Sequence, residues 1–283
     1  MESLVSTESA HSSSLGEQAG VVLFSQWNEF CDLRKLVLRQ GDSEDIHDLR
    51  VASRRMRATL DLLTPFITGK SVKRISKALR RVTRAVGRLR NIDEAIIYFK
   101  ALPVALPTLS GMLPRARKEE LRRVTSVLKR LPRRELDRLL RAEVADLARI
   151  PDDDQQLALY LSQTSIQRYQ TVYNLLLPAT TPENVKIRHA LRIAIKKWRY
   201  LLETMGQVCR QDYSATLETL KEYQTLLGSL NDMVEFAVLC HTLKIPAHEA
   251  AEIKAVLERD TADYLARFVE TAATRPPLYT FSL

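Results

Sequence analysis

A pattern of eleven residues occurs twice in this chain of 283 residues. Residues 47–57 and residues 189–199 both read His-x-x-Arg-(Val/Ile)-Ala-x-(Arg/Lys)-(Arg/Lys)-x-Arg, and the two copies are 142 positions apart. Because the cations recur at helical spacing, the repetition predicts a duplicated helical unit. An ordinary solvated helix surface needs no fixed arrangement of this kind. We therefore expect the duplicated unit to hold an anion.

The duplication continues into the helix expected after each copy, where Gly87 and Gly228 each begin a Gly-x-Leu sequence. No segment alternates apolar and polar residues for long enough to indicate a strand, so we expect an all-α fold. The simplest architecture is two four-helix bundles with long helices, related by pseudo-two-fold symmetry. The expected divisions are a disordered lead-in at residues 1–16, repeats at 17–150 and 151–274, and a C-terminal tail at 275–283.

Glycine and proline divide the expected helices. We predict helices at residues 17–39, 44–63, 69–101, 114–131, 133–150, 155–177, 182–205, 212–243 and 246–273. Pro103 and Pro107 predict a loop before the fourth helix. Thr181 followed by Pro182 is typical of a helix start, because Thr can cap the helix and Pro suits its first position.

Projection of the first basic helix separates its cations from its apolar side chains. At about 100° per residue, Arg50, Arg54 and Arg57 lie within about 80° of His47, opposite the apolar residues. Arg55 lies on the flank. Like charges three or four residues apart destabilise a helix by a few tenths of a kcal/mol per pair. A row of arginines about one turn apart therefore favours a linear chain of phosphates, which guanidinium groups bind bidentately; the alternative is a solvated surface.

The second basic helix has the same arrangement, with Arg192, Lys196 and Arg199 beside His189 and Lys197 on the flank. Arg54 and Lys196 are both expected to project away from the core. Glu203 follows Arg199 by four residues, as Asp61 follows Arg57. We expect these acids to form intrahelical pairs that orient the arginines, or simple surface ion pairs.

The net charge is concentrated around the first basic helix. Lys and Arg number 43 against 34 Asp and Glu, and residues 44–90 alone carry the whole net charge of +9. Such a local field indicates a polyanionic partner. Further candidate ligands from this segment are Arg80, Arg84, Arg88 and Arg90.

The two histidines can be read in two ways. His47 and His189 could orient an arginine or donate to a phosphate oxygen, or they could be capping or packing residues. They are poor metal ligands, because Val51 and Ile193 stand four residues on and no acid or Cys completes a site. We expect neither a metal nor a cofactor.

Other features exclude several classes of protein. No apolar run approaches the roughly 20 residues that span a bilayer, so we expect no membrane segment. The Ser-rich N-terminus lacks the features of a signal peptide. Three dispersed cysteines without CxxC spacing are typical of reduced core thiols in a cytoplasmic protein. Because nucleophile, phosphate-loop and zinc-protease motifs are missing, we expect no enzymatic activity.

The doubled basic helices and the Gly-x-Leu sequences that follow them resemble the CHAD domain, the conserved histidine α-helical domain, over nearly the whole chain. The resemblance implies two four-helix bundles around a basic central groove or pore. It also implies binding of inorganic polyphosphate and association with polyphosphate granules, as a stand-alone module. The residues it implicates are His47, Arg50, Arg54, Arg57, Arg80, Arg90, His189, Arg192, Lys196, Lys197, Arg199 and Lys221.

Two other functions remain open from the sequence. A nucleic-acid-binding protein could use the same basic field, although aromatic residues do not interleave with it as single-strand stacking requires. A polyphosphate-processing enzyme would need an acid and metal constellation, which the sequence does not indicate.

Overall fold

The structure, a computed structural model, describes residues 13–67, 69–148 and 154–279. Every regular element in these ranges is helical, as the sequence predicted, and there is no strand among them. The first half contains α1 (Leu15–Arg39), α2 (Ser43–Leu63), the 3₁₀ helix η1 (Thr64–Phe66), α3 (Gly69–Ala101), α4 (Pro107–Lys129) and α5 (Arg133–Leu147). The second half contains α6 (Asp154–Ala179), α7 (Val185–Val208), α8 (Ser214–Leu243) and α9 (Ala247–Thr274).

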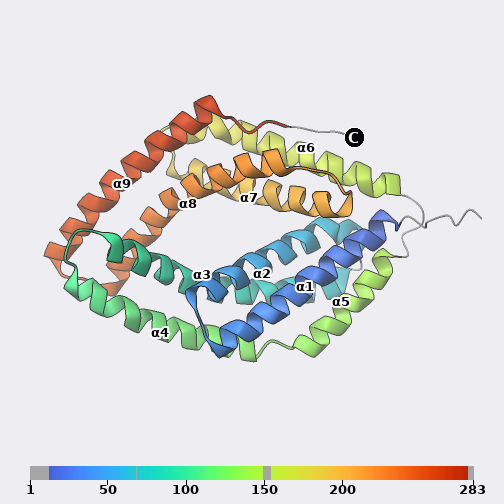
Figure 1. Cartoon of the computed structure of the whole chain (residues 1–283), viewed down its shortest axis with the longest axis horizontal. Coiled ribbons are helices and arrows are strands. Elements are labelled where there is room, and N and C mark those ends of the chain that lie inside the picture. Colours follow the sequence, from blue (N-terminus) through green and yellow to red (C-terminus); the bar gives the residue numbers. More distant parts are fainter. Residues whose placement is uncertain (1–12, 68, 149–153, 280–283) are drawn as a thin grey trace, which may run out of the picture.

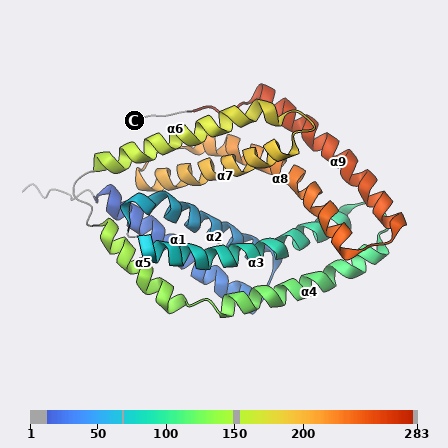
Figure 2. The ribbon, with the colours of Figure 1, turned by 180° about the vertical axis from the view of Figure 1, so that it is seen from behind.

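Consecutive helices pack against each other within each half, except that α5 packs on α1 and α3 rather than on α4. The halves meet through α1, α2, α3, α6, α7 and α8. The basic helices α2 and α7 contact each other, as do α3 and α8. The long helices α3, α4, α8 and α9 extend together to one end of the molecule, at the left of Figure 1 and the right of Figure 2. The other end is formed by α1, α2, α5, α6 and α7.

Buried apolar side chains form two cores, and each core takes residues from both halves. The larger core includes Leu49, Met56, Ile195 and Trp198 from the basic helices. The smaller core joins the ends of α3, α4, α8 and α9, around Phe99 and others. Along the long helices the change of core falls between Leu89 and Ile92 on α3 and between Leu230 and Met233 on α8. The short segments between these apolar residues are polar, and they lie where the two halves meet.

The start of α4 differs from the prediction, because a residue from the other half caps this helix. The helix begins at Pro107 rather than near residue 114, and Pro114 lies inside it. Glu249 of α9 accepts hydrogen bonds from the backbone N–H groups of Thr108 (2.9 Å) and Leu109 (3.1 Å). These N–H groups have no partner within their own helix. A cap supplied from 140 residues away leaves no local signal.

The start of α7 was also predicted wrongly. The helix begins at Val185, and residues 180–184 form a turn instead of the expected first turn at Pro182. The buried side chain of Arg188 donates to the carbonyl oxygens of Thr181 and Pro182, both at 2.6 Å, and to that of Ala179 at 3.4 Å. Because the guanidinium satisfies carbonyl groups at the last residue of α6 and in the turn itself, the turn is stabilised against continuing as helix.

At the N-terminus, α1 begins two residues earlier than predicted. Ser14 and Glu17 form a reciprocal capping box there, so residues 15 and 16 of the expected lead-in are helical. The predicted boundary at Pro151 and most of the lead-in lie outside the described residues. All three cysteines are free thiols, and Cys31 and Cys240 are buried. None of the helices in the described part of the chain is both long and apolar enough to cross a bilayer.

Candidate functional site

The basic helices α2 and α7 position the candidate site. On α2, Leu49, Met56 and Leu60 are fully buried in the larger core, and this fixes the rotation of the helix. Arg50, Arg54 and Arg57 are thereby turned toward α3 and α7. On α7, burial of Leu191, Ile195 and Trp198 orients Arg192 and Lys196 in the same way.

Contact between the two helices joins their cations into one group. We call Arg50, Arg54, Arg57, Arg192 and Lys196 the central cluster. Burial lowers the pKa of Arg50 to about 10, and the charges of Arg54 and Arg192 act in the same direction. Burial also lowers the pKa of Arg57, with contributions from Arg80 and Arg84 of α3. The cluster therefore includes residues of both repeats and is bordered by α3.

Lys196 is the most buried member of the central cluster. Its side chain was expected to project away from the core, but the residue is only 6% exposed. Burial, followed by the neighbouring charges of Arg192, Arg54 and Arg50, lowers its pKa to about 6. The expectation was wrong because contact between α2 and α7 covers this side of the helix.

Several donors in the central cluster have no acceptor. The Nε atoms of Arg50, Arg57 and Arg192 are buried and make no hydrogen bond. Buried donors are nearly always paired, so three unpaired guanidinium donors in one place require an explanation. Gly87 faces the same place, because a Cβ there would lie 3.7 Å from Arg50 Nε.

Few acids balance the charge of the cluster. Asp232 of α8 is a nearby carboxylate, and its pKa is raised by burial against the opposing effect of Arg192. Asn91, the counterpart of Asp232 in the first repeat, is uncharged and donates to Glu235 at 3.1 Å. Sequence reasoning missed Asp232 as a site residue, although its position in the repeated Gly-x-Leu segment is a usable signal.

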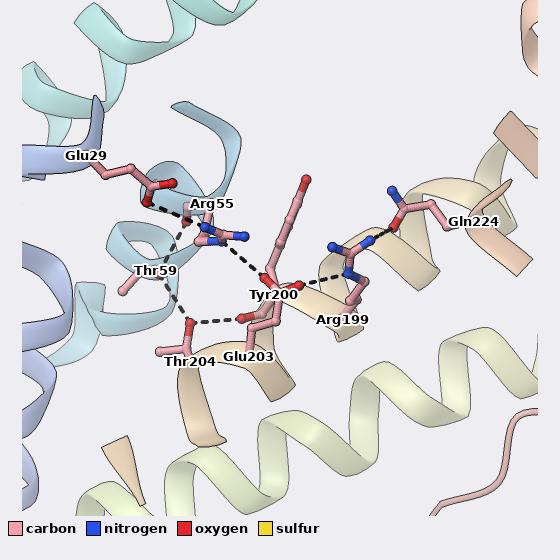
Figure 3. Close-up of polar contacts among 8 residues, drawn as sticks. All are labelled: Glu29, Arg55, Thr59, Arg199, Tyr200, Glu203, Thr204 and Gln224. Carbon is pink, nitrogen blue, oxygen red and sulfur yellow. Dashed lines mark hydrogen bonds and ion pairs between the residues drawn. The ribbon is translucent and has the colours of Figure 1, made fainter. Parts of the chain in front are cut away.

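Arg55 and Arg199 are held by carboxylates beside the cluster. Glu203 accepts from Arg55 Nε at 3.2 Å and from Arg199 Nε at 2.8 Å (Figure 3). Arg199 also donates to Gln224 at 2.7 Å, and Arg55 lies 3.5 Å from Glu29. The intrahelical pair between Arg199 and Glu203 is therefore confirmed, whereas no ion pair joins Arg57 to Asp61.

The remaining predicted ligands lie outside the central cluster, in ion pairs or along other cavities. Arg88 pairs with Glu120 at 3.5 Å, and Arg90 pairs with Glu94. Lys221 lines a small cavity beside Arg199 and Glu203. Lys197 lines a separate groove between α6 and α7. The structure thus brings five of the fifteen predicted residues together in the central cluster, with Arg80 and Arg84 near Arg57.

The two motif histidines have different surroundings. His189 is exposed, and its Nδ1 is 3.1 Å from Oδ1 of Asn231 on α8. His47 is half-buried. Within the described residues, no group of three or more His, Cys, Asp or Glu side chains is placed to hold a metal ion.

Comparison with known proteins identifies relatives of this arrangement. The family model that matches is that of the CHAD domain, over residues 22–241. The CHAD domain from the plant Ricinus communis is similar at a TM-score of 0.66 and 19% identity, over 94% of this chain and 89% of that chain. PptA from Streptomyces chartreusis is similar at a TM-score of 0.58 and 18% identity, over 92% and 97% of the two chains. A comparison with curated proteins gave no match.

Proposed function

This chain belongs to the CHAD domain family, and on that premise we propose that it binds inorganic polyphosphate as a non-enzymatic module. The central cluster is the binding site in this proposal. Association with polyphosphate granules in the cytoplasm would follow from the same interaction.

The observation that carries the proposal is the set of unpaired guanidinium donors in the central cluster. The Nε groups of Arg50, Arg57 and Arg192 are buried without acceptors, among cations that raise one another's electrostatic energy. An anion with several oxygens would satisfy these donors and remove the repulsion at once. A linear polyphosphate suits the arrangement because the arginines of each helix recur about one turn apart.

The proposal can be tested by calorimetric titration with long-chain polyphosphate at several salt concentrations. Affinity should fall steeply with salt, because each neutralised phosphate releases counterions. Replacing Arg54 and Arg192 by Gln should weaken binding at least about tenfold, given that hydrogen bonds to charged groups contribute about 1.5–3 kcal/mol each. It should also reduce the salt dependence.

A matched control removes two charges elsewhere. Arg123 and Arg141 are exposed and pair with acids on their own helices, so their replacement by Gln should leave affinity within about twofold. Equal losses in both double variants, or no binding at low salt, would refute the proposal. Competition with DNA and RNA at matched phosphate concentration tests the nucleic-acid alternative. Release of orthophosphate with Mg²⁺ or Mn²⁺ would indicate a processing enzyme instead.

A further inference from the structure

A groove between α6 and α7 carries cations that the central cluster does not use. Its volume is about 440 Å³, and Arg168 and Lys197 line it together with Thr164, Gln167 and Thr171. No carboxylate is among its lining residues. Lys197 follows Lys196 by one residue, so the two side chains leave α7 about 100° apart. The groove therefore opens beside the central cluster and on a different face of the helix.

Both cations of the groove lack an acidic partner within the described part of the chain. Arg168 is half-buried, and its Nε is a buried donor without an acceptor. Burial lowers its pKa, and Asp61 and Tyr160 oppose this effect without forming an ion pair or hydrogen bond with it. Lys197 is exposed and forms no ion pair. Two neighbouring cations and an unused donor are unfavourable unless an anion is present.

The first repeat shows how the same position is neutralised when no anion is needed. Arg55 occupies the place of Lys197 in the repeated pattern, and it pairs with Glu203 at 3.2 Å and Glu29 at 3.5 Å. The repeat counterpart of Glu203 is Asp61, which is shorter by one methylene. Asp61 forms no ion pair with Lys197. Protein carboxylates therefore neutralise the cation at this position in the first repeat and do not neutralise it in the second.

We propose that the groove between α6 and α7 is a second anion site, in which Arg168 and Lys197 bind a single phosphate group. Arg168 supplies the fixed guanidinium donor and Lys197 a mobile ammonium group from the opposite wall. The side chains of Thr164 and Gln167 offer further donors within the groove. The group bound is either free orthophosphate or the terminal phosphate of a chain. This site does not depend on the function proposed for the central cluster.

The test is a titration with inorganic phosphate, followed by backbone amide NMR shifts of the deuterated, full-length protein. Saturable shifts are expected for Thr164, Ala190 and Ile193, which line the groove. Exposed Lys197 can be replaced by Gln without disturbing the fold. K197Q should lower the phosphate affinity obtained from these shifts about fivefold. The double variant R168Q/K197Q should abolish them. The matched control is R55Q, which alters the equivalent position of the first repeat and should leave them unchanged.

The outcomes separate this inference from the central site. Groove amides that do not shift, or that shift equally in K197Q and the native protein, refute the inference. Shifts lost in R54Q/R192Q also refute it, because they would then report on the central cluster. If the groove amides shift with phosphate although polyphosphate does not bind the central cluster, the inference about the groove is supported and the function proposed for the central cluster is not. Repeating the titration with tripolyphosphate distinguishes the sources, because a chain end is bound more tightly than orthophosphate only if the groove accepts the rest of the chain.

Discussion

Replacing Lys196 by Met should stabilise the ligand-free protein, and the gain should depend on pH. The pKa of Lys196 is lowered from its usual 10.5 to about 6 by burial and by neighbouring arginines. Between these two values the unfolded chain binds one proton more than the folded protein. The free energy of unfolding of the unsubstituted protein therefore rises with pH over this window. The stability lost by burying Lys196, which we call the penalty, is largest below pH 6.

The magnitude follows from the same two pKa values. Each pKa unit corresponds to about 1.36 kcal/mol, so the penalty is about 5 kcal/mol at pH 7 and about 2 kcal/mol at pH 9. Methionine has a similar length and no charge, so K196M avoids the penalty at both pH values. The stability advantage of K196M should consequently shrink by about 3 kcal/mol between pH 7 and pH 9.

Urea unfolding at the two pH values measures this difference. Packing changes caused by Met contribute equally at both, so they cancel in the comparison. The control is K197M, which makes the same substitution at the adjacent, exposed position. An advantage that is the same at pH 7 and pH 9, or that grows with pH, would show that Lys196 is not held deprotonated and would refute the reasoning.

Three further predictions concern other contacts. E249Q should lower the free energy of unfolding by about 1–2 kcal/mol, since α4 loses charged capping. Although burial alone would raise the pKa of Glu249, the hydrogen bonds it accepts from Thr108 and Leu109 hold it below its usual value, so its contribution should be present above about pH 4.5 and disappear on acidification through its folded pKa. R188L should cost about 2–4 kcal/mol in urea unfolding, because three carbonyl groups at the α6–α7 turn lose their donor. Finally, polyphosphate binding at pH 7.5 should take up about one proton, because phosphate next to Lys196 favours its charged form; calorimetry in buffers of different ionisation enthalpy should show this uptake in the native protein and not in K196M.

The helical fold could be predicted from sequence because its signals are local. Apolar residues at helical spacing and breaks at Gly and Pro placed most helix ends within a few residues, including α3 at Gly69–Ala101. The errors occur where a side chain outside the helix end itself decides where that helix starts or stops. Glu249 starts α4 from another repeat, and Arg188 stabilises the turn before its own helix through carbonyl groups.

The candidate site was predictable to the extent that one helix determines it. Projection correctly separated Arg50 and Arg54 from the buried Leu49 and Met56. It could not show which polar side chains the neighbouring helix would cover. Lys196 is buried because α2 lies against α7, and Arg55 is neutralised because Glu29 and Glu203 come from two other helices.

The anchoring of the surrounding helices in the two cores explains how a destabilising group of cations can be maintained. Burial and the neighbouring arginines lower the pKa of Lys196, and repulsion among the cluster's cations would separate two helices that were held only at this point. Here α2 and α7 are anchored in the larger core, while α3 and α8 continue past the cluster into the smaller core. The polar segments between Leu89 and Ile92 and between Leu230 and Met233 are therefore clamped on both sides by buried apolar contacts. Burial of apolar surface stabilises the fold by roughly 25 cal/mol per Å² and offsets the unfavourable free energy of the clustered cations. The unpaired donors are therefore held in place before any anion binds.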